Sequence, residues 1–594
     1  MKKRLQRPLF LLALLFVLAA CGQSATVSEE DKTPALPTEA PTTIPEADEP
    51  VSDLPTAVEY NLGETTIVQS QFSEDSRFRN MPVRLNGIIA VPAGDGGPYP
   101  VVVIFHGTHP GCPVDETEVD RWPCDPEVEQ PNYRGFAYLA EALAAQGYVT
   151  LAPNLNAENT FGFGEPQPGE RLLQIVELQL DALAEAVAGG PNGFGVALAG
   201  RADLSRMAIF GHSRGGEAAS WLANTRGLAA PDAAEKFGYG PVKGLLLLAP
   251  APIFTVPAAS SVPQAVILPA CDGDVMLQDG QLFYEGARLD PTQEAWALSV
   301  WLEQANHNYF NSTLGSDIFA IVNRADCETL LTPETQRQFL VDFATTFLTT
   351  IFSDDPQAVD GALAALGMDP AALAPDSLFG LPARVMTLAP AADRRPLLIP
   401  AGAEELTTNL AGGEVVADGV NLFYCEAGYF TPSVRPGSEP CKRANVTIPG
   451  NPAMVVTSWE RSGAILSLAL PEGAGDLSDY TTISLRAAVD PMSELNAAGT
   501  PQAFSVRLTD RSGASATVRT RPGEPALTFP VGIVTEDDVF EDGLFSGRVP
   551  MTTIRLLLSD FSGVDLSQIS QITLLFDQTD SGALFLGDLE LVRE

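Results

Sequence analysis

The chain has 594 residues, of which 45% are hydrophobic and 19% are charged, so it can form more than one domain with its own core. Its formal net charge is −40 at pH 7. Nucleic acid is therefore excluded as an expected partner, because phosphate binding requires a basic face.

Residues 1–21 are expected to be a targeting segment outside the fold. Four basic residues precede an apolar core, 9–20, that is too short to span a bilayer as a helix. The segment ends in Leu-Ala-Ala-Cys-Gly, which resembles the lipobox of bacterial lipoprotein signals. The resemblance implies cleavage before Cys21, lipidation of its thiol and a protein anchored to the cell membrane outside the cytoplasm. The alternative is an ordinary secretory signal with a chance cysteine.

Residues 22–57 are rich in Thr, Pro, Glu, Asp and Ala, with few large apolar groups. Such a segment cannot bury enough surface to offset its ordering entropy, so we expect a disordered tether. Without Cys21, six cysteines remain, and an even number in an oxidising compartment indicates disulfides. Six cysteines allow fifteen pairings. Proximity along the chain favours Cys112–Cys124, Cys271–Cys327 and Cys425–Cys441.

Residues 58–351 are predicted to form an α/β domain in which strands alternate with helices. Two early strands are followed by the β-branched run 101–105, which is typical of a strand buried on both faces. The expected strands are 65–68, 83–91, 101–105, 148–152, 207–210, 244–249, 265–269 and 295–302, and the expected helices are 136–145, 172–187 and 335–351. This alternation predicts a doubly wound, mostly parallel sheet with helices on both faces.

The centre of this domain is Gly211-His-Ser-Arg-Gly-Gly216, between an apolar run and an Ala-rich amphipathic segment. We interpret it as a nucleophile elbow with Ser213 at the corner between strand and helix. Gly211 and Gly215 must be small, because strand and helix nearly touch there. The helix N-terminus behind Ser213 would stabilise negative charge.

An acid and a base are expected at the carboxyl ends of later strands. The strand ending near residue 269 is followed by two aspartates, of which Asp274 is the predicted acid and Asp272 the alternative. His307 follows the next strand and is the one histidine downstream of the acid. The order Ser, Asp, His is the order of α/β-hydrolase triads.

The oxyanion hole is expected to use the backbone N–H of Arg214 and that of Thr108, where Gly107 lets the backbone approach the substrate. His106 is interpreted as orienting this loop, and His212 as packing beside the sheet. We expect no cofactor and no metal. The aspartates after residue 271 lack the spacing of a calcium-binding loop. The chain has four histidines, which provide no recognisable set of zinc ligands.

The motifs His-Gly-Thr, Gly-His-Ser-Arg-Gly-Gly, Cys-Asp-Gly-Asp-Val and Asn-His-Asn-Tyr-Phe-Asn together resemble bacterial secreted α/β-hydrolases grouped near chlorophyllases, platelet-activating-factor acetylhydrolases and polyester hydrolases. The resemblance covers about residues 60–350 and implies a serine esterase. Cys271 stands where many relatives have Gly. A disulfide from Cys271 to Cys327 would hold the loop that carries Asp272 and Asp274, the acid loop, against the segment after His307. This favours Asp274 over Asp272 as the acid.

The second half begins with residues 352–396, expected to be a linker or a partial cover of the site. From residue 397 onward, short strands are separated by Gly, Asp and Ser turns without helices, which predicts an antiparallel β-sandwich up to residue 594. Its end, 564–591, resembles galactose-binding-like jelly rolls. Members of that class often bind carbohydrate. A structural or spacing module is the alternative.

The sequence as a whole predicts a lipid-anchored serine hydrolase that cleaves carboxylic esters of a small molecule, a lipid or a polyester through an acyl-enzyme. Two alternatives remain open. One is a serine peptidase of the same fold, and the other is a surface-binding protein with an idle site. Residues 58–352 alone are expected to hydrolyse small esters.

Overall fold

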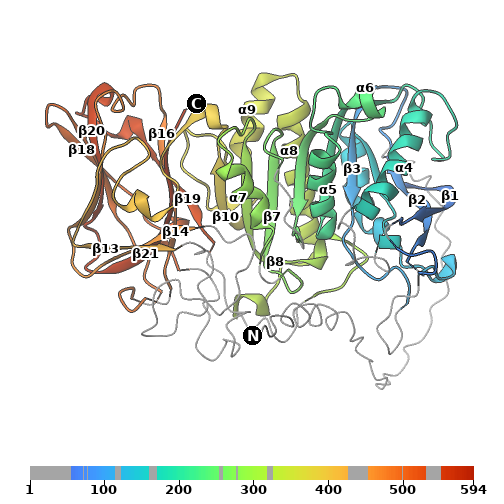
Figure 1. Ribbon diagram of the computed structural model, residues 1–594, viewed down its shortest axis with the longest axis horizontal. Helices are drawn as coiled ribbons and strands as arrows, with labels where there is room; N and C mark the ends of the chain where they lie inside the picture. Colours follow the sequence, from blue (N-terminus) through green and yellow to red (C-terminus); the bar gives the residue numbers. More distant parts are fainter. Residues whose placement is uncertain are drawn as a thin grey trace, which may run out of the picture.

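The computed structural model describes residues 55–593, apart from 71, 77, 114–121, 159–169, 253–258, 276–277, 318–324, 426–452, 492, 498 and 530–549. The described chain forms a unit of strands and helices followed by a unit built mainly of strands (Figure 1). Within these ranges we find no helix with the length and apolar character that a membrane span requires.

The first unit is organised by a ten-stranded sheet in the order β1-β2-β4-β3-β5-β6-β7-β8-β10-β9. Its strands are β1 (Val58–Val68), β2 (Asn80–Ala90), β3 (Tyr99–Phe105), β4 (Val149–Pro153), β5 (Ala202–His212), β6 (Val242–Leu248), β7 (Gln264–Cys271), β8 (Ala297–Asn306), β9 (Ser377–Leu378) and β10 (Leu381–Leu388).

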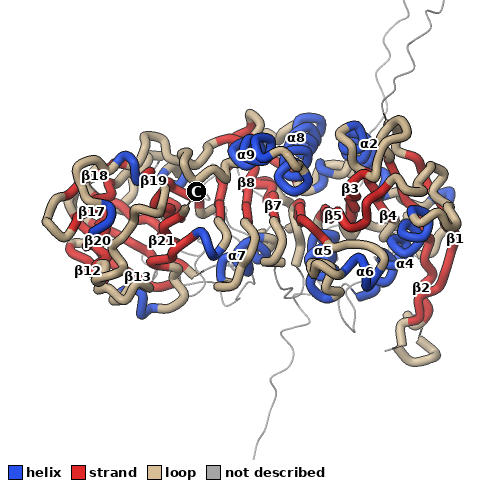
Figure 2. The backbone as a smooth tube through the Cα atoms, turned by 90° about the horizontal axis from the view of Figure 1, so that it is seen from above, coloured by secondary structure: helices blue, strands red, loops and turns tan. Residues whose placement is uncertain are grey.

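Helices cover both faces of this sheet (Figure 2). They are α2 (Ala137–Ala145), α4 (Glu170–Val187), α5 (Arg214–Thr225), α6 (Ala233–Phe237), α7 (Gln281–Leu289), α8 (Pro333–Phe352) and α9 (Pro356–Ala365). Successive side chains of a strand point to opposite faces. In β3, Val101 and Val103 accordingly pack with α4 and α5, whereas Val102 and Ile104 pack with α2 and α8.

The predicted fold class, an α/β-hydrolase with a doubly wound, mostly parallel sheet, is wrong. Only the centre of the sheet, from β4 through β3, β5, β6 and β7 to β8, is parallel. The pairs β1–β2, β2–β4, β8–β10 and β10–β9 are antiparallel. The sheet is therefore mixed, because antiparallel strands extend it at both edges, and the two sheets of the second unit are antiparallel throughout.

The second unit is a sandwich of two sheets around one apolar core. One sheet contains β11 (Arg394–Leu398), β13 (Val420–Cys425), β14 (Met454–Trp459), β16 (Thr482–Val489), β19 (Thr552–Leu557) and β21 (Gly582–Val592). The other contains β12 (Val415–Asp418), β15 (Ala464–Ala469), β17 (Ser505–Asp510), β18 (Ser515–Arg519) and β20 (Ile569–Phe576). Trp459 of the first sheet stacks on Phe576 of the second, with ring centroids 4.3 Å apart.

Residues 352–396, expected to be a linker or a cover, instead belong to the two units. The helix α9 follows α8, and β10 pairs with β8 in the ten-stranded sheet. The next strand, β11, pairs with β21 in the sandwich. The sequence between β8 and β10 did not reveal this pairing, because the paired residues run from Ala383–Leu302 to Leu388–Ala297 and are far apart in the chain.

The two units share a buried interface on α7. Glu285 of this helix pairs with Arg486 of β16 at 2.8 Å, and Arg288 pairs with Asp588 of β21 at 2.6 Å. Glu285 and Arg288 also pair with each other, as do Arg486 and Asp588. All four side chains are at most 5% exposed. Met386 of β10 packs in the same apolar cluster as α7 and several sandwich residues. The sandwich is thus joined to the first unit by charge pairs and by a continuous core.

Candidate active site

Ser213 lies at the corner between β5 and α5, in the backbone conformation that a nucleophile elbow requires. Its φ is 55° and its ψ is −126°, a region that costs a non-glycine residue free energy. Two backbone hydrogen bonds to the residues around the end of β6 hold this conformation, from Ser213 N–H to Leu248 O at 2.9 Å and from Ala251 N–H to Ser213 O at 3.1 Å, and Gly216 N–H also donates to Ser213 O at 2.9 Å. The corner is therefore fixed by the end of the neighbouring strand β6 and the residues that follow it.

The flanking glycines leave no room for side chains. A Cβ on Gly211 would lie 2.3 Å from Gly215 O, and a Cβ on Gly215 would lie 2.6 Å from Phe105 O. Both contacts are to backbone atoms that cannot move aside. The strand and helix approach each other here as the sequence predicted.

The acid that accepts a hydrogen bond from His307 Nδ1 is Asp272, the alternative, and not Asp274, the predicted choice. Asp272 Oδ2 accepts a hydrogen bond from His307 Nδ1–H at 2.9 Å, and both side chains are buried. The reason is the length of β7, which continues to Cys271 rather than ending at Pro269. Asp272 is consequently the first residue beyond the strand, beside the end of β8.

The second oxygen of Asp272 is held by its own loop. Asp272 Oδ1 accepts from the N–H groups of Asp274 at 3.0 Å and Val275 at 2.6 Å. Asp274 itself has a half-exposed side chain, with Oδ2 3.6 Å from His307 Nε2. Asp274 therefore faces the nitrogen opposite the one that Asp272 binds.

A third carboxylate, Asp317, was not found by sequence reasoning. Its Oδ2 accepts from Gly273 N–H at 2.9 Å, and the side chain is buried. Its pKa is raised to about 7, because burial and the charges of Asp272 and Asp274 outweigh the attraction of His307. No local pattern marks Asp317, since only the fold brings it to the acid loop.

These carboxylates set the basicity of His307. Burial by itself lowers the pKa of His307, but the charge and hydrogen bond of Asp272 and the charges of Asp274 and Asp317 raise it to about 10. His307 Nε2 has no hydrogen-bond partner among the described residues. Catalytic hydrogen bonds are often completed only in the complex with substrate.

Asp272, His307 and Asp317 also form the group best placed to hold a cation, with one ligand atom of each within 4.8 Å of the others. Two carboxylates and an imidazole are common ligands of divalent transition metals. However, His307 Nδ1 and Asp272 Oδ2 already bond to each other, and Asp317 Oδ2 is bonded to the backbone. The donor set is thus engaged in fixing the loop and the imidazole, which does not fit a metal site.

His106 fixes the loop that was expected to form the oxyanion hole. Its Nε2 accepts from Leu155 N–H at 2.8 Å, so the proton must be on Nδ1, which donates to Gly107 O at 2.8 Å. Burial lowers its pKa to about 4, although the bond to Gly107 opposes this, so the ring is neutral. Because N–H and C=O of a trans peptide point in opposite directions, Thr108 N–H points away from His106.

Gly107 of this peptide lies against Ser213. A Cβ on Gly107 would lie 2.7 Å from Ser213 Cβ and 3.3 Å from Ser213 Oγ. Arg214 is the first residue of α5, where N–H groups point out of the helix end. The roles of Thr108 and Arg214 as donors stay predictions, and this geometry is compatible with them.

His212 joins the elbow to His307. Its Nε2 lies 3.0 Å from His307 O, a contact in which the nitrogen must be the donor. The two rings pack with centroids 4.7 Å apart. Burial holds the pKa of His212 well below its usual value, so this ring is neutral, and it packs against His307 without competing for its proton.

A buried group of charges surrounds Arg214 and was also missed from the sequence. Its guanidinium lies 4.0 Å from a carboxylate oxygen of Glu158 and 3.7 Å from one of Glu217, and Arg171 lies 3.4 Å from Glu158. All four side chains are at most 7% exposed. These pairs restrain the first turn of α5 behind Ser213.

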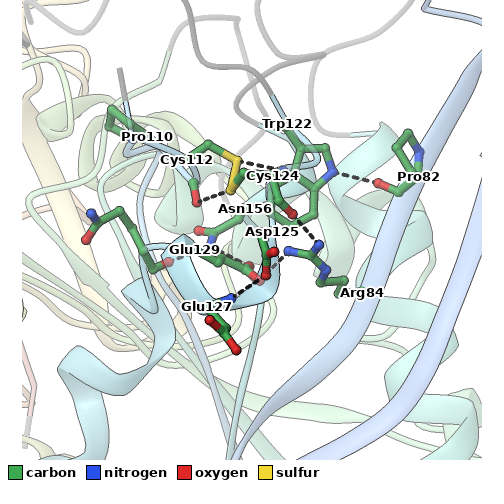
Figure 3. The surroundings of a disulfide bond; sticks show 12 residues. Pro82, Arg84, Pro110, Cys112, Trp122, Cys124, Asp125, Glu127, Glu129 and Asn156 are labelled. Atoms are coloured by element: carbon green, nitrogen blue, oxygen red, sulfur yellow. Dashed lines mark hydrogen bonds and ion pairs between the residues drawn. A yellow bond between two sulfur atoms is a disulfide. The ribbon is translucent and has the colours of Figure 1, made fainter. Parts of the chain in front are cut away.

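Two of the expected disulfides are present, and each is close to a loop of the candidate site. Cys271–Cys327 starts at the residue before Asp272. Cys112–Cys124 follows the His106 loop, where Arg84 donates to Cys124 O and pairs with Glu129 (Figure 3). The third expected partner, Cys441, and the lipidation site, Cys21, lie outside the described residues.

Comparison with known proteins adds little to this site. No protein family model matches the chain, and no curated protein matches it. Among solved structures, the chain is similar to the family 11 carbohydrate-binding module of the cellulosomal cellulase Lic26A-Cel5E of Clostridium thermocellum. The identity is 12% and the TM-score 0.20, over 34% of this chain and 95% of that one. A likeness at this level establishes neither a shared fold nor a shared ligand, so carbohydrate binding by the sandwich stays a prediction.

Proposed function

We propose that this protein is a serine hydrolase that cleaves carboxylic esters through an acyl-enzyme. The observation that carries the proposal is the buried Asp272–His307 hydrogen bond, in which His307 packs on His212, the residue before Ser213. Ser213 itself has a positive φ at a strand-to-helix corner. A nucleophile, a base and an oriented carboxylate are the parts that acyl transfer requires. The motifs that resemble secreted serine esterases support the same chemistry.

In the proposed reaction, Ser213 Oγ attacks the ester carbonyl carbon while its proton passes to His307 Nε2. Asp272 holds the other ring nitrogen and stabilises the imidazolium that forms. When the carbon–oxygen bond to the alcohol breaks, the alcohol leaves with the proton from His307. Water, deprotonated by His307, then attacks the acyl-enzyme. The bond between the acyl carbon and Ser213 Oγ breaks, His307 returns the proton to Oγ, and the acid is released.

The proposal is tested with p-nitrophenyl esters of increasing acyl length and with a fluorophosphonate label. Ser213→Ala should reduce turnover to background and abolish labelling. The matched control is Ser205→Ala, at an exposed position of the same strand, which should keep full activity. Activity that survives in Ser213→Ala would disprove the assignment. Turnover of peptide amides at rates close to those of esters would favour the peptidase, and a protein without turnover or labelling would favour the surface-binding protein.

We also propose that the protein works outside the cytoplasm, anchored to the membrane through Cys21. The basic and apolar leader and the lipobox-like Leu-Ala-Ala-Cys-Gly support this, as do the two disulfides of the described chain. Cys21→Ala should release the protein from the membrane fraction in a cell that processes lipoproteins. Retention of the variant in that fraction would count against the anchor.

A further inference from the structure

His109 is a buried histidine close to Ser213, and it is not a member of the proposed triad. It lies in the loop after β3, three residues beyond His106, and is 9% exposed. Its ring stacks on that of His212 at 5.9 Å, and His212 in turn packs against His307. His109, His212 and His307 thus form a row of rings beside the elbow.

The Nε2 atom of His109 is buried and has no hydrogen-bond partner among the described residues. A buried polar atom without a partner is unfavourable, so this atom is free to bond to a substrate group. The place that a Cβ on Gly107 would occupy lies 3.1 Å from His109 Nε2 and 3.3 Å from Ser213 Oγ. Both atoms therefore border the same small space beside the Gly107–Thr108 peptide.

The charge state of His109 limits what it can do there. Burial, followed by the neighbouring His307 and His106, lowers its pKa to about 3. No carboxylate forms an ion pair with it among the described residues, in contrast to His307, which is bound by Asp272. A neutral ring of such low basicity is a poor general base, but it retains one N–H that can be donated.

The loop that carries His109 is held in place before any substrate arrives. Gly107 O is bonded to His106, and Gly111 O accepts from Gln130 N–H at 3.0 Å. The disulfide at Cys112 closes the far end of the loop (Figure 3). A donor on a fixed loop loses little free energy in reorganisation when charge develops on a substrate oxygen.

We propose that His109 is a further catalytic residue, which donates Nε2–H to the acyl oxygen of the substrate as a side-chain member of the oxyanion hole. This inference rests on the proposed esterase function. The oxygen that becomes negative when Ser213 attacks would be bound by His109 together with backbone N–H groups. No proton is transferred in this role, because the hydrogen bond only strengthens as the carbonyl oxygen gains charge.

The test compares His109→Phe, which keeps a ring for stacking, with His109→Gln, which keeps an N–H donor. Loss of one oxyanion donor typically lowers kcat by about 10²- to 10³-fold, so His109→Phe should show such a loss with little change in KM. His109→Gln should recover part of kcat. The acidic limb of the pH profile should not move in either variant, because His307 and not His109 titrates there.

A thionoester substrate gives a readout that a purely structural role would not change. Sulfur accepts hydrogen bonds poorly, so an enzyme with an intact hole prefers the oxygen ester, and His109→Phe should lose part of that preference. Unchanged kcat and an unchanged preference in both variants would overturn the inference. Loss of the acidic limb in His109→Phe would also overturn it, since His109 would then be the base.

The inference and the proposed function can fail separately. If the wild-type protein has no Ser213-dependent ester turnover, the proposed function fails. If turnover depends on Ser213 but not on His109, only the inference fails. Should His109→Phe unfold, His109→Gln with the pair of ester and thionoester still decides the question.

Discussion

Replacing Arg486 with methionine would leave two buried carboxylates with a single guanidinium. Arg486 pairs with Glu285 at 2.8 Å and with Asp588 at 2.9 Å, and all three side chains are 3–5% exposed. Arg288 would remain as the only cation of the network. Methionine fills a similar volume, so the change removes charge and hydrogen bonds more than it removes packing.

The expected loss follows from the burial of this network. Removal of one partner from a buried ion pair costs about 3–5 kcal/mol, because the remaining charge stays in a poorly solvated site. Two charge-assisted hydrogen bonds at about 1.5–3 kcal/mol each lead to a similar figure. A folded domain is stable by only about 5–15 kcal/mol, so this change alone should lower the unfolding midpoint strongly.

The assay is urea unfolding followed by fluorescence and by ester turnover on the same samples. The control is Arg461→Met, which breaks the ion pair with Asp418 at 3.7 Å, where both side chains are 73% exposed. Exposed pairs contribute about 0–1 kcal/mol, so this midpoint should barely move. If Arg486→Met is no less stable than Arg461→Met, the network does not stabilise the interface and the reasoning is wrong.

Three further outcomes are expected from the site and the interface. Asp272→Asn should lower kcat by roughly 10⁴-fold, because His307 then loses its orienting carboxylate. Asp274→Asn should keep most of the maximal rate. Steady-state kinetics of both variants shows which aspartate orients His307. His307 must be unprotonated to act as a base, and its pKa is raised to about 10, so kcat/KM should increase with pH toward that value. Asp274→Asn removes one charge that raises this pKa, so the increase should shift to lower pH. An unshifted increase would contradict the role given to Asp274. Reduction of Cys271–Cys327, a disulfide that contributes about 2–4 kcal/mol of stability, should abolish turnover before the protein unfolds. Turnover and fluorescence are followed together during titration with reductant. Loss of turnover and of the folded signal at the same point would show that the disulfide does not hold the loop of Asp272.

Local chemistry explains which parts of the site the sequence predicted. The elbow is encoded within six residues, 211–216, because its glycines and the strained Ser213 are neighbours in the chain. His307 was found from its position after the next strand and from the chain order of serine, acid and histidine. Asp272 was assigned second place because the end of β7 was placed two residues too early, and the ends of strands are the least certain feature of a sequence-based prediction.

Contacts between distant segments account for what the sequence did not predict. Asp317 contacts Gly273, beside Asp272, only because the fold brings these segments together. His109 and Ser213 come close because they follow β3 and β5, which are neighbours in the sheet. The pairing of β10 with β8 joins residues 383–388 to 297–302, and no periodicity in either segment specifies the other. The mixed character of the sheet follows from that pairing and from β2–β4, which is why the parallel prediction failed.

The same reasoning revises the expectation that residues 58–352 would act alone. A chain that ends at residue 352 lacks β10 and leaves Glu285 and Arg288 without Arg486 and Asp588. The helix that carries these two charges begins seven residues after Asp274. We therefore expect the truncated chain to be insoluble or inactive, and soluble expression with ester turnover would contradict this.

The ion network across the interface also bears on how such a protein can diversify over generations. A gene segment for the first unit that recombined with a different C-terminal partner would bring Glu285 and Arg288 without their counterparts, so most such fusions would be eliminated by instability. Descendants with a new partner should carry compensating changes at these two positions, such as apolar residues. In this chain, the boundary at which recombination is tolerated therefore does not coincide with the change from helices to strands in the sequence.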